Sequence, residues 1–192
     1  MKLFSQDKII VFDTEYTTWE GALERKWSGP NEYREIVQIG AVKINTANLS
    51  SIDIFSVFIK PVKNPLLSDY FTSLTGITQK DVDIGGLSFA EAHEKFYRWS
   101  DGLDLYSFGT DGEVLAENCK LFNITPLFEQ RRFYVIKEIF KAHGIPADNY
   151  MSSTIIEAFG HKKTREGHNA LNDALTIVDG LKLLTQKLAH KN

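Results

Sequence analysis

The hydrophobic positions near the start of the chain form three short runs separated by polar segments. The first run, at 8–12, is continuous and apolar, which is typical of a strand buried on both faces. Residues 36–44 form a second run, and residues 52–59 alternate between apolar and polar side chains after a polar break at 45–48. Runs of this length joined by short breaks predict strands that pair with their neighbours, here as an antiparallel meander.

The rest of the chain alternates between strand and helix patterns. Ser88, followed three residues later by Glu91, has the spacing of a capping box and predicts a helix to about Ser100 that stops near Gly102. Residues 133–140 fit either a strand or a helix, and their setting between strand and helix patterns favours a strand that runs into a helix. The patterns also predict a strand at 103–108, a helix from 111 to about 120, a short helix at 153–159 capped by Gly160, and a long helix at 169–189.

This order of elements predicts the fold class. A meander followed by alternating strands and helices indicates an α/β protein with a mixed sheet, in which antiparallel strands are followed by parallel ones and helices flank the sheet. The long helix at 169–189 is apolar on more than one face and is expected to pack against that sheet. Two polar segments, at 17–34 and 61–86, are expected to be loops, the second with a short element at 70–74. Ligands of such sheets bind at the C-terminal ends of strands.

Composition restricts the class of protein. A chain of 192 residues with 43% hydrophobic and 24% charged residues fits one globular domain, expected to span 1–192. The single cysteine, Cys119, excludes an internal disulfide framework and fits a buried apolar position in a reducing compartment. No run approaches the roughly 18 apolar residues that span a membrane, and the first residues do not resemble a signal peptide. We therefore expect a cytoplasmic protein.

The formal net charge of −3 argues against a protein that coats duplex nucleic acid through bulk electrostatics. It does not argue against a nuclease, because divalent cations held by carboxylates invert the local field. The acidic residues are therefore the first candidates for a metal-binding catalytic site.

Two of these acids, Asp13 and Glu15, close the first predicted strand. Side chains alternate along a strand, so residues 13 and 15 point to the same face. Two adjacent carboxylates repel each other unless a positive charge lies between them, and their hard oxygen atoms favour Mg²⁺ or Mn²⁺. A solvated strand end is the alternative, and it would be preferred for an isolated Asp-x-Glu pair.

Three further residues occur where helices begin. Asp111 follows an apolar strand and opens a helix, so it fits a helix N-cap and also a side chain that faces the same crevice as Asp13. Five residues of helix turn through too large an angle for His168 and Asp173 to point the same way, so His168 is expected in the loop before the last helix. Taken singly, each of these two residues has a structural explanation. A histidine next to a helix start is usually structural or exposed, and a carboxylate near a helix N-terminus is favourable in itself.

Together these residues suggest a reaction. Two metal ions about 4 Å apart can clamp a scissile phosphate and lower the pKa of a bound water, and histidine titrates where a general base is needed. We assign Asp13, Glu15 and Asp173 to the more tightly held metal. Asp13 and Asp111 would hold the substrate-linked metal. His168 would accept the proton of the attacking water.

These motifs resemble those of the DEDDh 3′→5′ exonuclease superfamily. Its first motif is similar to IIVFDTEYT here, its second to FGTDGEVL and its third to HNALNDA, in the same order and over residues 9–174. The strings REIVQIGAV and FTSLTGITQKDVD resemble the branch of KapD-like proteins and of exonucleases that trim histone mRNA ends. The resemblance implies an RNase H-like fold, two Mg²⁺ or Mn²⁺ ions, single-stranded RNA or DNA 3′ ends as substrate with RNA favoured, and release of nucleoside 5′-monophosphates.

The resemblance also implies where the substrate binds. The backbone around Thr14 and Glu15 would receive the 3′-terminal ribose. Leu74, Gly76 and Ile77 would lie beside the terminal base, against which an apolar side chain stacks or wedges. The alternative interpretation is that Leu74 and Ile77 are core residues and Gly76 is a turn residue.

Two segments fall outside the family motifs. The loop at 17–34 carries Trp19, Arg25, Lys26, Trp27 and Arg34. It fits a partly packed surface loop or a substrate lip with stacking aromatics. The basic stretch of His161, Lys162, Lys163 and Arg165 fits an exposed loop or a guide for the phosphate backbone.

Two other functions compete with the exonuclease. A binding module that has lost turnover would have no reason to keep both metal ligands and a base. A phosphohydrolase of small nucleotides would use the same carboxylates, and the shape of the crevice decides between it and a polymer-cleaving enzyme. The sequence does not distinguish RNA from DNA, and although dimers occur in this superfamily, it identifies no dimer interface.

Overall fold

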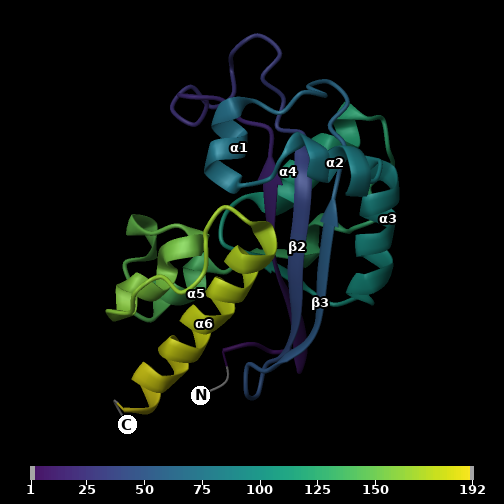
Figure 1. Ribbon diagram of the computed structural model, residues 1–192. Helices are drawn as coiled ribbons and strands as arrows, with labels where there is room; N and C mark the ends of the chain where they lie inside the picture. The colour runs from purple at the N-terminus through teal and green to yellow at the C-terminus, as the bar shows by residue number, and fades with distance from the viewer. Residues whose placement is uncertain (1–2, 191–192) are drawn as a thin grey trace.

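The first three strands are consecutive in the chain and adjacent in the sheet (Figure 1). In the computed structural model, which describes residues 3–190, β1 (Lys8–Tyr16) pairs antiparallel with β2 (Ile36–Asn45), and β2 pairs antiparallel with β3 (Ser51–Phe58). β4 (Leu105–Ser107) pairs parallel to β1, and β5 (Phe133–Val135) pairs parallel to β4. The order β3-β2-β1-β4-β5 confirms the predicted mixed sheet and its antiparallel meander.

Helices connect and cover these strands. The α-helices are α1 (Asp69–Thr75), α2 (Gln79–Gly85), α3 (Phe89–Ser100), α4 (Asp111–Leu121), α5 (Lys137–Ala142) and α6 (Ala170–Ala189). Three 3₁₀ segments, η1 (Gln130–Arg132), η2 (Ala147–Asn149) and η3 (Ser152–Phe159), complete the elements of the described residues. Within residues 3–190, no helix combines the length and the apolarity needed to cross a lipid bilayer.

The buried run of β1 explains why the sheet has two cores. Ile9 and Val11 pack on one face with side chains of α6, whereas Ile10 and Phe12 pack on the other face with side chains of α3 and α4. All four are fully buried. Alternating side chains that are all apolar require cover on both faces, and Figure 1 shows α6 on one side of the strands and α3 and α4 on the other.

Most of the predicted boundaries are confirmed. Ser88 and Glu91 form the predicted capping box at the start of α3, and the backbone turns left-handed at Asp101 after its end. Residues 133–140 form a short strand that runs into a helix, as predicted. The short helix at 153–159 is present as η3, of the 3₁₀ type, and ends at Gly160.

The segment at 61–86 differs from its prediction as a loop, because it holds two helices. Gly76, with φ of 71°, ends α1, and Thr78 then begins α2 through a capping box with Asp81. Each helix has only seven residues, and α2 buries only Val82. So short a helix gives no hydrophobic period in the sequence, and its capping box was the signal that the prediction missed.

Candidate active site

The five residues predicted to carry chemistry line one cavity, although they come from three separate parts of the chain. The cavity has a volume of about 390 Å³ and includes the last residues of β1 in its wall. Its lining contains Asp13, Glu15, Asp111, His168 and Asp173. The fold therefore brings together the residues that the three sequence motifs separate.

β1 supplies the two carboxylates that share a strand face. Asp13 is 7% exposed and Glu15 is 9% exposed. The pairing of β1 with β2 is regular through the contact of Glu15 with Gln38 and becomes irregular at the next residue, Tyr16. Irregular pairing of this kind re-aims side chains where a strand leaves a sheet, and here it follows directly after the second carboxylate.

Asp111 is positioned by α4 and by β1. It is the first residue of α4, and Thr110 is the N-cap, so the expectation that Asp111 itself caps the helix is wrong. Its Oδ1 atom instead accepts hydrogen bonds from the backbone N–H of Thr14 at 3.0 Å and from the Thr14 hydroxyl at 2.7 Å. A carboxylate used in this way links the end of β1 to the start of α4.

The start of α6 is placed by direct contact with β2. A Cβ atom built on Gly40 would lie 2.1 Å from the backbone nitrogen of Leu171, so only glycine allows this approach. The side chain of Gln38 accepts a hydrogen bond from the backbone N–H of Ala170 at 2.9 Å. Gly40 lies opposite Asp13 in the β1–β2 register. The first turn of α6, which carries Asp173, is therefore held beside the β1 carboxylates.

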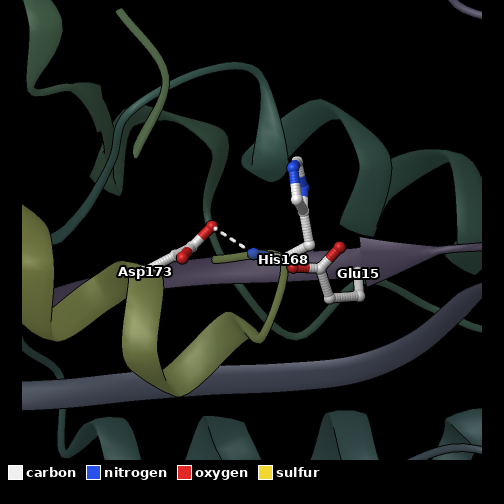
Figure 2. Close-up of side chains that lie close together, drawn as sticks. All are labelled: Glu15, His168 and Asp173. Carbon is white, nitrogen blue, oxygen red and sulfur yellow. Dashed lines mark hydrogen bonds between the residues drawn. The ribbon is translucent and has the colours of Figure 1, made fainter. Parts of the chain in front are cut away.

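His168 lies in the turn before α6, as predicted, and has a φ of 58°. Its backbone N–H donates a hydrogen bond of 3.3 Å to Oδ2 of Asp173 (Figure 2). Among the described residues, one ligand atom each of Glu15, His168 and Asp173 lies within 4.8 Å of the other two. Figure 2 shows Glu15 on β1 beside His168 in the turn before α6, with Asp173 on the first turn of α6.

Burial makes the ionised carboxylates unfavourable. Burial first, and then the charges of Asp111, Glu15 and Asp173, raise the pKa of Asp13 well above its ordinary value. Burial and the same kind of repulsion also raise the pKa of Glu15. Burial raises the pKa of Asp111, although hydrogen bonds from Thr14 oppose this.

Asp173 shows the same effect and has an unused oxygen atom. Burial raises its pKa to about 6, although hydrogen bonds from the Ser152 hydroxyl and the His168 backbone oppose the rise. In the described part of the chain, its buried Oδ1 atom has no hydrogen-bond partner. A cluster of desolvated carboxylates with an unpartnered oxygen is the donor set that a divalent cation takes.

The imidazole of His168 has the opposite shift. Partial burial and then the positive charge of Lys163 lower the pKa of His168 below its ordinary value. The ring is therefore neutral at neutral pH and able to accept a proton.

Only some of the residues expected to touch the terminal nucleotide line the cavity. Leu74, on α1, lines the cavity, and so does Thr14. Ile77 is 2% exposed and packs with Val37, Phe71 and Val82 in a small core cluster. Gly76 is the left-handed residue that ends α1. For Ile77 and Gly76 the arrangement matches the alternative interpretation, a core residue and a turn residue.

Other residues of the cavity were not singled out from the sequence. Ser152, the first residue of η3, donates a hydrogen bond of 3.1 Å from its hydroxyl to Oδ2 of Asp173. Tyr16, Tyr70 and Met151 also line the cavity. Tyr16 lies within the first motif, which was a usable signal, whereas Ser152 and Met151 belong to no motif and reach the site only through the fold.

Comparison with known proteins places this site in a family. The model of the exonuclease family RNase_T matches residues 10–181, which includes all five residues of the site.

Similar proteins carry related activities in their names. Human 3′-5′ exoribonuclease 1 is 29% identical over 182 residues, covering 89% of this chain and 50% of that protein. The probable 3′-5′ exonuclease KapD of Bacillus subtilis (strain 168) is 29% identical over 194 residues, covering 94% of this chain and 85% of KapD. The chain thus spans about half the length of the mammalian exoribonuclease 1 proteins that it matches.

Solved structures share the fold. The nuclease domain of 3′hExo, a DEDDh family member bound to rAMP, has a TM-score of 0.80 and 26% identity, covering 95% of this chain and 94% of that one. A 3′-exonuclease in a structure of 3′-end recognition of histone mRNA stem-loop has a TM-score of 0.78 and 24% identity, covering 94% of this chain and 82% of that one. These likenesses confirm the expected RNase H-like fold and the DEDDh resemblance.

Proposed function

This chain belongs to the RNase_T exonuclease family, and on that premise we propose that it removes nucleotides from the 3′ end of single-stranded nucleic acid with the help of divalent metal ions. The observation that carries the proposal is the convergence of Asp13, Glu15, Asp111, His168 and Asp173 on one cavity. The relatives named as 3′-5′ exonucleases support the direction of the reaction.

The donor set fits divalent cations. Four carboxylates are buried side by side, and no lysine or arginine of the described residues lines the cavity; Lys163, outside the lining, offsets part of the effect at Asp173 alone. The unpartnered Oδ1 of Asp173 adds a buried acceptor that needs a positive partner. Hard oxygen ligands favour Mg²⁺ or Mn²⁺. When bound, two such ions would polarise the phosphate and neutralise the charge that develops on it.

Each residue then has a role in holding the ions or moving a proton. Asp13, Glu15 and Asp173 would hold one ion. Asp13 and Asp111 would hold the other, with Thr14 fixing Asp111 in place. His168 would take the proton of the attacking water, which its neutral ring allows. The Ser152 hydroxyl would keep Asp173 oriented.

Single-stranded RNA is the substrate that we propose first. The relatives include several named exoribonucleases, and one similar structure holds rAMP. The products would be nucleoside 5′-monophosphates. We treat 1–192 as one exonuclease domain because the family match runs from β1 into α6. A cytoplasmic location stays a prediction.

The test is a cleavage assay with 5′-labelled single-stranded RNA and DNA of the same sequence, in Mg²⁺, Mn²⁺ or EDTA. We expect a ladder that shortens from the 3′ end and disappears in EDTA, with RNA cleaved at least as fast as DNA. Equal cleavage in EDTA would contradict the metal requirement. If neither polymer is shortened while a small nucleotide phosphodiester is hydrolysed, the cavity serves small substrates instead. If nothing is hydrolysed, the chain is a binding module.

A further inference from the structure

The loop at 17–34, here called the lip, contributes an apolar wall to the cavity that holds the carboxylates. Trp19, Leu23 and Trp27 all line this cavity. Leu23 is 64% exposed, so its side chain stands at the solvent edge of the cavity. The lip lies beside α1, as Figure 1 shows at the top of the view, and the Ser68 hydroxyl donates a 2.6 Å hydrogen bond to the carbonyl of Thr18.

Contacts within the lip fix its conformation, although several of its side chains are exposed. The side chain of Arg25 binds Glu32, whose carboxylate also accepts the backbone N–H of Gly29. Lys26 and Trp27 adopt φ values of 55° and 51°, a left-handed conformation that is strained for residues with side chains. Strain of this kind persists only where surrounding contacts impose it, and it clusters where a side chain must be aimed.

Trp27 is held by three separate contacts. Its indole N–H donates a 3.2 Å hydrogen bond to the carbonyl of Thr17, and its ring packs edge-on against Tyr16 at 5.4 Å. The guanidinium of Arg34 lies 5.6 Å from the centre of the same ring. Trp19 differs, because no ring pair among the described residues includes it. Neither face of its indole is therefore stacked on another aromatic ring.

Both arginines of the lip are already paired, and its lysine, Lys26, does not line the cavity. Arg25 is paired with Glu32, and Arg34 is paired with Glu117. No lysine or arginine of the described residues lines the cavity. The wall of the lip therefore has aromatic faces to offer a ligand and no free cation.

We propose that the lip is a binding subsite for an unpaired nucleobase of the substrate strand, which stacks on Trp19 beside Trp27 with Leu23 at the rim. This inference rests on the proposed function and adds a specificity device to it. Every base has a π face, so stacking tolerates any sequence. A base in a duplex must unpair before it can turn into the lip, so the same wall favours single-stranded ends.

The test couples a protein change to a substrate change. Trp19→Leu removes the aromatic face and keeps an apolar side chain, whereas Trp19→Phe keeps a smaller aromatic face. The substrates are a single-stranded oligonucleotide and versions of it with an abasic site at the last or second-last position. We expect Trp19→Leu to lower kcat/KM on the intact strand about tenfold, mainly through KM, with most of the loss restored in Trp19→Phe.

The abasic strands decide whether a base is what Trp19 contacts. At the position that reaches the lip, removal of the base should lower kcat/KM of the wild type, and Trp19→Leu should then cause little further loss. Equal losses from Trp19→Leu on intact strands and on both abasic strands would overturn the proposal. A wild type that shortens no strand would instead overturn the exonuclease proposal itself, so the two failures are distinguishable.

Leu23 supplies a second variant with a matched control. Leu23→Ser and Leu66→Ser each replace an exposed leucine of a loop, 64% and 79% exposed, and only Leu23 lines the cavity. We expect Leu23→Ser to raise KM a few-fold and Leu66→Ser to leave kcat and KM unchanged. Indistinguishable effects of the two changes would contradict a binding role for the lip.

Discussion

Two regions of the cavity, here called the floor and the lip, differ in charge, burial and backbone structure. The floor, defined as the carboxylates of Asp13, Glu15, Asp111 and Asp173, stands on β1, α4 and α6 and is buried. The lip is a loop with exposed apolar side chains and strained backbone at Lys26 and Trp27. The floor concentrates negative charge, whereas the lip presents aromatic faces, and both of its arginines are already paired.

The difference shows where each task can be placed. Groups that act on a reacting bond must keep their positions, so they stand on elements fixed by the core, such as β1 between its two apolar layers. Groups that select a substrate can stand on a loop carried by that scaffold. The two regions also lower the stability of the fold in different ways. In the floor the unfavourable free energy comes from desolvated charges, and in the lip it comes from a strained backbone conformation. Changes in the floor should therefore alter kcat and stability, and changes in the lip should alter KM.

The largest effect is expected from Asp13→Ala. Asp13 is assigned to both metal ions, so its loss should lower kcat by at least about 1,000-fold, as the loss of major transition-state stabilisation does. The fold should persist, because the removed carboxylate is repelled by three others. Cleavage rates and far-UV circular dichroism measure the two outcomes. Glu113→Ala, an exposed carboxylate on α4, is the control, and wild-type cleavage by Asp13→Ala would remove the metal assignment.

His168→Gln should have the next largest effect. Removal of a general base lowers rates by about 100- to 10,000-fold, while the carboxylates continue to hold metal. Because the pKa of His168 is lowered from its ordinary value, the base is neutral above that pKa, and wild-type kcat should fall with acid only below about pH 6.5. At saturating metal, which keeps the carboxylates ionised, the variant should lose this acid limb. His161→Gln, at an exposed position of the preceding loop, should behave as wild type, and a retained acid limb in His168→Gln would exclude the base role.

Asp173→Asn should raise the stability of the metal-free protein. The folded pKa of Asp173 is raised to about 6 from 3.8, so the stability that its neutral form supplies is complete below pH 3.8 and is lost as the pH rises through about 6. At pH 8 in EDTA the variant should be more stable by on the order of 2 kcal/mol, and the gain should shrink towards pH 5. Denaturant unfolding at both pH values measures this. An equal difference at the two pH values would show that ionisation of Asp173 is not the cause.

The sequence predicted the sheet because its signals are local and repeated. The apolar run of β1, the strand pattern of β3 and the capping box of α3 each lie within about ten residues, and each element was confirmed, although β3 is largely exposed on both faces. α2 was missed because seven residues with one buried side chain carry no period. The prediction of an element was therefore reliable where the sequence pattern repeats over several residues, and it failed where the element is too short for a pattern to repeat.

The site was predictable as a set of residues but not as a geometry. The acids and His168 lie in motifs, so their identities could be found in the sequence. Their convergence depends on Gly40 admitting the backbone of α6 and on Gln38 binding Ala170 across 132 positions of chain. No local signal encodes such a contact. For the same reason Ile77, which belongs to a motif, could not be assigned to the core before its neighbours were known.

The smallest effect, expected from Arg34→Met, tests whether the lip and the floor can be separated. The guanidinium of Arg34 lies over both Tyr16 and Trp27 and pairs with Glu117, an exposed partner. Such pairs and cation–π contacts each contribute about 1 kcal/mol or less at exposed sites. Methionine keeps the apolar stem of the side chain and removes the charge.

We therefore expect KM for the oligonucleotide to rise about threefold in Arg34→Met while kcat stays unchanged, measured by initial rates at saturating metal. Arg98→Met, which breaks the exposed pair with Glu94 on α3, should change neither constant. Tyr16, which Arg34 also covers, directly follows Glu15 in β1, so the variant also reports on the floor. A fall in kcat at constant KM would mean that Arg34 acts on the carboxylates through Tyr16. Substrate binding and catalysis in this cavity would then both depend on the same residue, Arg34.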